Sequence, residues 1–212
     1  MTAFQTPNPI AVTFDVLSAT VDVVASDRTD TVVQVRAADP AKKADVRAAA
    51  QTQVEYADGT LTVKTPKDWR TYTAFGGNPT IEVTIEAPTG SRVKGTAGCG
   101  NLHVTGEFGE SQVETSMGDI VLDRPLGSVT AKTSKGDIRI GAAARGEIRL
   151  ETSMGELEVG IRPGSAVNVQ SNTMQGTVQN QLGPVSDAHG DTVHVFARSS
   201  MGNITIRHAV AA

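Results

Sequence analysis

The chain has 212 residues, enough to bury a sizeable core, and its charge is mild, with 19 Lys and Arg against 23 Asp and Glu. No basic cluster is present to neutralise phosphates, and only 4% of the residues are aromatic, so nucleic acid is not expected as a partner. The single cysteine, Cys99, excludes an internal disulfide and a cysteine-based zinc site.

The N-terminus and the hydropathy pattern predict a cytoplasmic location. Residues 1–9 have neither the positive segment nor the apolar segment of a secretory signal. No run approaches the roughly 18 apolar residues that a membrane-spanning helix needs, so direct membrane insertion is not expected.

Up to residue 90 the pattern predicts β-rich structure with one short helix. Apolar and polar residues alternate in the strands, good helix formers fill one segment, and the Asp58-Gly59 pair marks a hairpin turn. The predicted elements are strands within 10–36, a helix or helical turn over 42–53, hairpin strands over 54–56 and 61–63, an ordered loop over 65–79, and a strand over 81–86.

After residue 90 one short phrase repeats. The copies are Glu114–Leu122 (ETSMGDIVL), Lys132–Ile140 (KTSKGDIRI), Glu151–Val159 (ETSMGELEV) and a divergent copy at Arg198–Ile206 (RSSMGNITI). The corresponding glycines fall at positions 100, 118, 136, 155, 176 and 202. Repetition at a nearly fixed period predicts a fold made by stacking one unit on the next.

Alignment of the units gives inward and outward columns. The predicted inward columns are Ser111/Val129/Ile148, Val113/Ala131/Leu150, Thr115/Thr133/Thr152, Ile120/Ile138/Leu157 and Leu122/Ile140/Val159. The outward columns, Glu114/Lys132/Glu151 and Val121/Arg139/Glu158, place opposite charges on neighbouring strands when equivalent strands stack in parallel. We therefore predict an all-β fold, a parallel β-solenoid (β-helix-like) with two-strand coils of about 18 residues, and favour it over an antiparallel meander.

The predicted organisation is a β-rich region at 1–90 that caps the solenoid, solenoid repeats at 91–208, and a tail at 209–212. The strand at Ile204, Thr205 and Ile206 has no evident cap after it. Because exposed strand edges invite pairing, these residues are a candidate self-association edge that would give a dimer or a filament.

The turn itself offers two candidate sites. The acidic column Asp119, Asp137 and Glu156 suggests calcium, but one carboxylate per coil fits turn stabilisation better, and no metal site is predicted. Met117, Met154 and Met201 share one turn position, with Cys99 and Lys135 in the same slot and Met174 near it. These methionines either fold back over the core edge or form a candidate interaction ridge, and a copper site is the least favoured alternative.

The remaining candidates are weaker. The four histidines, at 103, 189, 194 and 208, lack metal-ligand spacing, and no catalytic residue is predicted, so the protein is not expected to be an enzyme. Trp69, Tyr72 and Phe75 are the densest aromatic group. They either plug the solenoid end or form a candidate ligand lip.

Several segments carry a family resemblance: Val21–Val35, Asp39–Val46, Gly59–Lys64 and the Gly-Asp-Ile repeats. Together they resemble the bacterial "putative adhesin" β-strand-repeat family, a family of unknown function, in its actinobacterial form. The resemblance covers most of the chain. It implies a β-solenoid and no known catalytic residues.

These observations predict a non-enzymatic scaffold or protein-interaction module without a cofactor. Its expected partner is another protein or a second copy of itself, bound through the C-terminal coil. The alternative is a carbohydrate-binding or carbohydrate-active β-helix, which needs a groove with clustered aromatics and a carboxylate pair. A polysaccharide is accordingly the less favoured partner.

Overall fold

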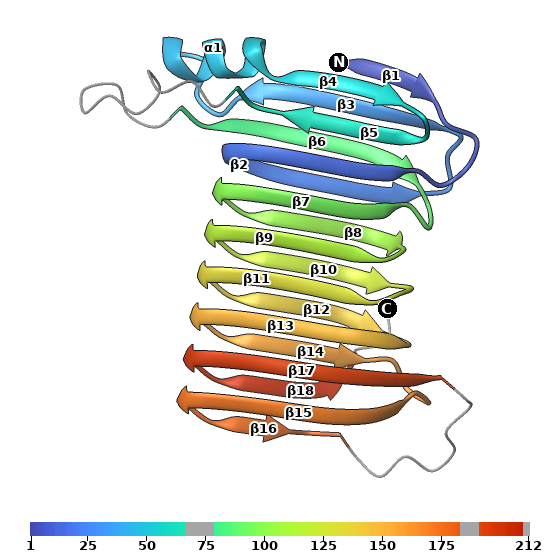
Figure 1. Cartoon of the computed structure of the whole chain (residues 1–212), viewed down its shortest axis with the longest axis vertical. Helices are drawn as coiled ribbons and strands as arrows, with labels where there is room; N and C mark the ends of the chain where they lie inside the picture. The colour runs from blue at the N-terminus through green and yellow to red at the C-terminus, as the bar shows by residue number, and fades with distance from the viewer. Residues whose placement is uncertain (67–78, 183–190, 210–212) are drawn as a thin grey trace.

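The protein is an elongated stack of β-strands with one helix at its N-terminal end (Figure 1). The computed structural model describes residues 1–66, 79–182 and 191–209. Within these ranges the fold is all-β with mostly parallel strand pairing and one short helix, as predicted.

The bounds of the elements follow chain order. The N-terminal part contains β1 (Thr2–Gln5), β2 (Ala11–Ser26), β3 (Asp30–Ala37), α1 (Lys43–Gln51), β4 (Gln53–Ala57), β5 (Thr60–Lys64) and β6 (Ile81–Pro88). The repeat part contains β7 (Arg92–Cys99), β8 (Leu102–Phe108), β9 (Ser111–Met117), β10 (Ile120–Pro125), β11 (Val129–Lys135), β12 (Ile138–Ala143), β13 (Gly146–Met154), β14 (Leu157–Ile161), β15 (Ala166–Gln175), β16 (Val178–Asn180), β17 (Thr192–Met201) and β18 (Ile204–His208).

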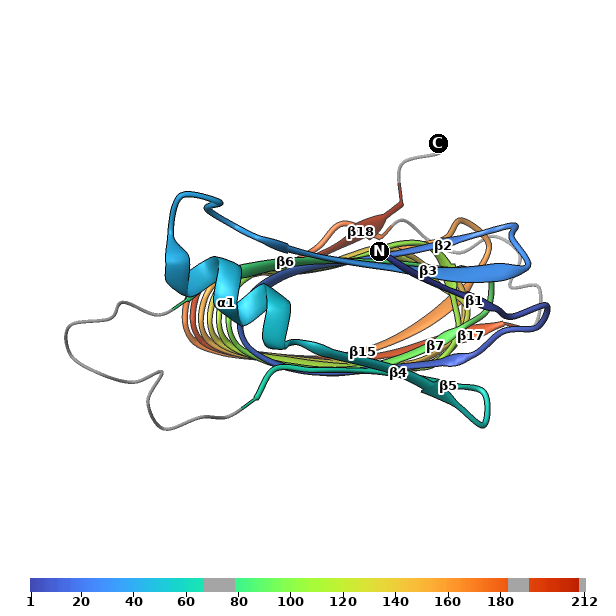
Figure 2. The same ribbon diagram turned by 90° about the horizontal axis from the view of Figure 1, so that it is seen from above.

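The strands lie in two facing sheets that form a flattened, nearly closed wall around the core (Figure 2). We call the sheet that contains β7, β9, β11 and β13 sheet B, and the sheet that contains β8, β10, β12 and β14 sheet A. In the repeat part, one strand of each sheet, joined to the other by a tight turn, makes a layer. The long strand β2 makes a whole layer alone, because its first half pairs in sheet B and its second half pairs in sheet A.

Layers next to each other in the stack are not always next to each other in the chain. From the N-terminal end the layers are β5/β6, β2, β7/β8, β9/β10, β11/β12, β13/β14, β17/β18 and β15/β16. The stack order therefore differs from the chain order at each end: β2 lies after β5/β6, and β17/β18 lies before β15/β16. The prediction that Ile204, Thr205 and Ile206 form a free edge is wrong, because β18 is paired with β14 on one side and with β16 on the other.

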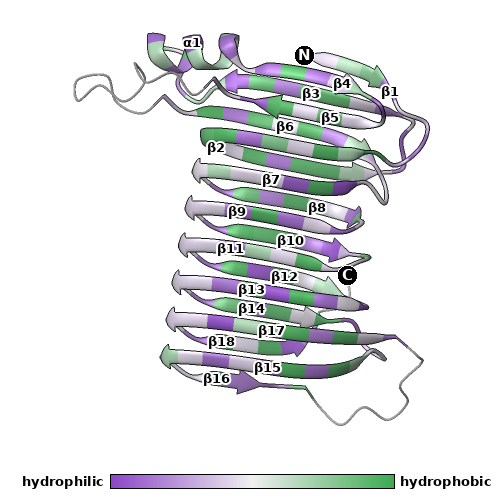
Figure 3. Ribbon diagram, viewed as in Figure 1, coloured by the Kyte–Doolittle hydropathy of each residue, from purple (hydrophilic) through white to green (hydrophobic). Residues whose placement is uncertain are grey.

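The core is one continuous cluster that runs from Ile10 to Ile206. Hydrophobic and hydrophilic residues alternate along the strands (Figure 3), so each strand sends one set of side chains inward. The predicted columns are confirmed residue by residue, since Val129 pairs with Ser111 and Ile148, and Ile138 pairs with Ile120 and Leu157.

The N-terminal end is closed by antiparallel strands and the helix. β4 pairs antiparallel with β5 through the predicted Asp58-Gly59 turn, β3 pairs antiparallel with β6, and β1 pairs antiparallel with β3. Helix α1 lies across the opening of the wall (Figure 2), with Ala48 and Ala49 packed against the core. At nine residues α1 is too short to span a bilayer, and no helix in the described ranges is long and apolar enough to do so.

Candidate functional site

The repeated turn forms one long corner of the wall, and glycine is what permits it. Gly136 has a φ of +148°, and a Cβ atom there would lie 2.0 Å from the carbonyl oxygen of Gly118 in the layer before it. Both the backbone conformation and the close approach exclude a side chain. Gly118, Gly155 and Gly202 have equivalent contacts with the neighbouring layer.

The polar side chains of the turn bond to the neighbouring layer. The N–H of Asp137 donates to Asp119 Oδ1 at 2.8 Å, and the N–H of Glu156 donates to Asp137 Oδ1 at 2.7 Å. On the inner side, Thr133 Oγ1 donates to the carbonyl of Gly118 at 3.2 Å. The acidic column therefore links layers along the corner, and no cluster of three or more His, Cys, Asp or Glu suited to a metal occurs among the described residues.

The shared turn position forms a continuous column along this corner. In stack order it holds Cys99, Met117, Lys135, Met154, Met201 and Gln175, each in register with the next. We call Met117, Met154 and Met201 the methionine corner. Their side chains are 53%, 47% and 47% exposed, so the edge of the core does not cover them. Met174 holds the preceding position, which is serine in the layers of the repeat.

Exposed apolar side chains concentrate near this corner and the last layer. Among the described residues the large hydrophobic side chains that are exposed are Met1, Val46, Met117, Met154, Met174, Val178 and Met201. Five of these seven belong to the methionine corner or to the β15/β16 layer. Single exposed apolar residues are ordinary in proteins, whereas a cluster indicates a contact surface.

The other predicted site cannot be placed. Trp69, Tyr72 and Phe75 lie outside the described residues.

Outward-facing charged side chains on sheet A connect three neighbouring layers through ion pairs. Glu158 on β14 accepts bonds from Arg139 on β12 at 2.6 Å and from Arg207 on β18 at 2.6 Å. Partial burial acts to raise the pKa of Glu158, but the hydrogen bonds and charges of Arg207 and Arg139 outweigh it and lower this pKa. On sheet B, Lys132 pairs with Glu151 at 3.3 Å. The Arg139–Glu158 and Lys132–Glu151 pairs were both predicted from the outward columns.

One pair was missed from the sequence. His103 Nδ1 lies 2.9 Å from Asp22 Oδ1, although 81 residues separate them in the chain. They face each other because β2 stacks beside β8, with Asp22 and His103 in register. This pair was not predicted, because β2 lies beside β8 in the stack although several strands separate them in the chain. The pair is half-exposed and forms a cross-strand contact that ties the β2 layer to the repeat layers.

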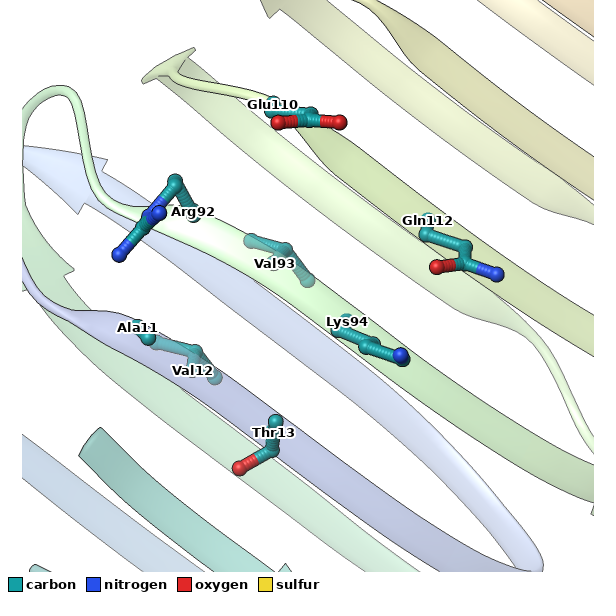
Figure 4. Close-up of a pocket in the computed structure, with 8 residues that line it drawn as sticks. All are labelled: Ala11, Val12, Thr13, Arg92, Val93, Lys94, Glu110 and Gln112. Carbon is teal, nitrogen blue, oxygen red and sulfur yellow. The ribbon is translucent and has the colours of Figure 1, made fainter.

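Two shallow hollows lie on the outer face of sheet B. The first is lined by Ala11, Val12, Thr13, Arg92, Val93, Lys94, Glu110 and Gln112 (Figure 4). It forms where the small side chains of β2 stand beside long polar side chains of β7 and the start of β9. The second hollow contains Phe196, whose ring is covered by the Arg149 guanidinium at 4.9 Å. Long, exposed polar side chains form much of both rims, so neither resembles the enclosed, largely apolar pocket typical of small-molecule sites.

Comparison with solved structures identifies proteins of similar fold. A "putative cell adhesion protein" from Clostridium sporogenes matches with a TM-score of 0.55 and 13% identity, over 98% of this chain and 98% of its own. A "putative adhesin" from Bacteroides fragilis matches with a TM-score of 0.50 and 13% identity, over 97% of this chain and 95% of its own. No protein-family model matches the chain. No curated protein matches it either. At this identity the likeness establishes a shared fold with proteins named as adhesins.

Proposed function

We propose that this protein is a non-enzymatic β-solenoid scaffold that binds a protein partner through its methionine corner. The observation that carries the proposal is the column of half-exposed methionines at a turn whose glycine, threonine and acidic residue serve the structure. Glycine makes room for the neighbouring layer, threonine and the acidic residue bond to it, and methionine is the apolar side chain of the turn that projects into solvent.

Methionine suits this role for physical reasons. Its unbranched side chain and polarizable sulfur adapt to differently shaped apolar partners at low energetic cost. Met154 and Met201 are neighbours in register, about 4.8 Å apart along the stack, and Lys135 separates them from Met117. A partner that fits would present apolar side chains to the methionines and an acidic group near Lys135.

The other parts of the proposal have separate support. The stacked parallel layers support a β-solenoid, and the two neighbours of similar fold support placement in the adhesin-like family that the sequence resembles. The repeated carboxylates accept backbone hydrogen bonds, a structural task that favours a scaffold over an enzyme. A cytoplasmic location stays a prediction, and fractionation of the source cells checks it.

Affinity capture with matched variants tests the proposal. The tagged full-length protein is expressed in its source organism, cross-linked to bound proteins in the cells, and captured from the lysate. The variant Met117→Gln/Met154→Gln/Met201→Gln is treated in the same way. The matched control is Ser116→Gln/Ser134→Gln/Ser153→Gln, which changes exposed neighbours in three repeat layers. We expect the wild type and the serine variant to retain a discrete protein that the methionine variant loses at least about tenfold, since each buried methionine contributes roughly 1.5–3 kcal/mol. Equal retention by all three proteins, or no partner at all, would contradict the proposal.

A further inference from the structure

The last layer of the stack has an open edge on both sheets. Within the described residues, β15 pairs only with β17 and β16 pairs only with β18. The inward-facing Val167 and Val169 are only partly buried, because no described layer lies beyond them. Such an edge presents unpaired backbone N–H and C=O groups and half-covered apolar side chains, and it can template another strand.

The usual protection of an exposed edge is missing from the sequence of this layer. Natural edge strands commonly carry Lys, other charges or proline. Between Arg162 and Asp187 the chain has no Asp, Glu, Lys, Arg or His, and neither β15 nor β16 contains proline. This uncharged segment includes the whole terminal layer.

The outward columns show the same change layer by layer. On sheet B the column Glu114, Lys132, Glu151 and Arg198 ends in Asn172. The adjacent column, which holds Gln112, Thr130, Arg149 and Phe196, ends in Gln170. On sheet A the column Arg139, Glu158 and Thr205 ends in Gln179. Each of these columns therefore ends in a side-chain amide at the open edge.

Amides at this edge point to a second copy of the same chain as the occupant. A two-fold axis brings side chains close to the axis near their own copies, where a charge would meet the same charge and repel it. A side-chain amide carries donors and an acceptor together, so it can bond to another amide of the same kind. Head-to-tail stacking is disfavoured, because the opposite end carries antiparallel β4, β3 and β1 and the helix α1 in place of a matching parallel layer.

We propose that the protein forms a two-fold dimer in which β15 pairs antiparallel with β15 of a second copy, with the axis near the middle of β15. A two-fold axis perpendicular to the sheets reverses the strand direction, keeps each sheet on its own side, and matches strands of equal length. With Gln170 opposite its own copy, the inward-facing Val169 and Val167 lie opposite the inward-facing Ser171 and Thr173 of the second copy, and the interior continues across the interface. This surface is distinct from the methionine corner, so the inference does not depend on the proposed function.

A charge-exchange experiment tests the dimer. Gln170 lies near the middle of β15, so Gln170→Lys and Gln170→Glu each place like charges together across a two-fold axis. The matched control is Gln112→Lys, which changes the same residue type in the same column in a middle layer. Light scattering and sedimentation measure the mass of each full-length protein between about 1 and 100 µM, and circular dichroism checks folding.

We expect a dimer for the wild type and for Gln112→Lys, and dissociation constants raised at least about tenfold for each Gln170 variant alone. An equimolar mixture of Gln170→Lys and Gln170→Glu should restore a heterodimer, which misfolded variants could not form. A wild type that stays monomeric, an open-ended polymer, a dimer that tolerates both variants, or a mixture that stays monomeric would each overturn the inference.

Discussion

The two ends of this protein share one rearrangement of the chain but are finished in different ways. At the N-terminal end, β2 lies between the β5/β6 layer and the repeat layers. At the C-terminal end, the β17/β18 layer lies between β13/β14 and β15/β16. Antiparallel strands and a helix close the first end, whereas the second ends in a parallel layer with unpaired edges in the described residues.

The difference between the two ends shows what limits the number of layers in the stack. Every parallel layer offers an edge to the next one, so a stack continues until a different element occupies that edge. Antiparallel β3 and β4 end the stack at the N-terminus, and α1 covers the core there. At the C-terminus the repeat phrase is poorly preserved instead, and side-chain amides replace its charged residues.

The largest expected effect is the loss of stability when a turn glycine is replaced by alanine, and this loss should be larger in a middle layer than in the last layer. Gly136→Ala places a Cβ atom about 2.0 Å from the Gly118 oxygen, between layers that are held on both sides. We expect a loss of stability on the order of 3 kcal/mol or more. Gly176→Ala meets the Gly202 oxygen at a similar 2.1 Å, but its layer has one neighbour and can move away, so a smaller loss is expected.

Urea unfolding of both variants measures this difference. Gly59→Ala is the control for backbone conformation alone, because its φ is +73° and no atom lies within 4 Å of the added Cβ. A loss for Gly176→Ala as large as that for Gly136→Ala would show that the last layer is as firmly held as the middle, and would contradict the comparison.

An intermediate effect is expected at the closed end. Asp45 on α1 is buried and accepts from the N–H of Thr80 at 3.1 Å and of Asp39 at 3.2 Å. Asp45→Ala leaves both donors without this partner, and we expect a loss of about 2 kcal/mol in urea unfolding. Asp45→Asn keeps one acceptor oxygen and should lose less. Equal stability of Asp45→Ala and the wild type would mean that the helix is not what secures this end.

The smallest expected effect concerns the charges beside the inserted β17/β18 layer. Glu158 has a lowered pKa in the folded protein, so its ionised form stabilises the fold above the unfolded pKa of about 4.3, and this contribution is lost as the pH falls through the lower folded value. Glu158→Gln should therefore cost roughly 1 kcal/mol or less at pH 7 and progressively less in acid.

Denaturant unfolding of Glu158→Gln and the wild type at pH 7, 5 and 3 checks this dependence. Glu114→Gln, an exposed outward carboxylate on sheet B, serves as the control and should change stability by less than about 0.5 kcal/mol. A difference between Glu158→Gln and the wild type that grows as the pH falls would contradict the assigned ion pairs.

The repeat part was predictable because its signal is local and recurrent. The positions of Ile120, Ile138 and Leu157 in equal units fixed both their inward direction and their register. The hairpin at Asp58-Gly59 followed from local turn chemistry, since both residues adopt positive φ. The exposure of the methionines was not predictable, because it depends on which way the turn projects from the core edge.

The exchanged layers were the main error, although one sequence signal for them existed. The outward column reads Glu114, Lys132, Glu151, Arg198 and then Asn172 in stack order, so opposite charges alternate only when β17 lies next to β13. Chain order would place Asn172 beside Glu151 and break that alternation. The divergent copy at 198–206 also keeps the phrase better than 172–178 does.

The sequence by itself determined the elements, their inward faces, the register of the repeats and the glycine corner, because each depends on spacing within or between equivalent units. The tertiary structure decided the order of layers at both ends, the pairing of His103 with Asp22, and the identity of the open edge. These features depend on competition between whole layers for the same edge. That competition is settled by contacts between residues far apart in the chain, which no local pattern records.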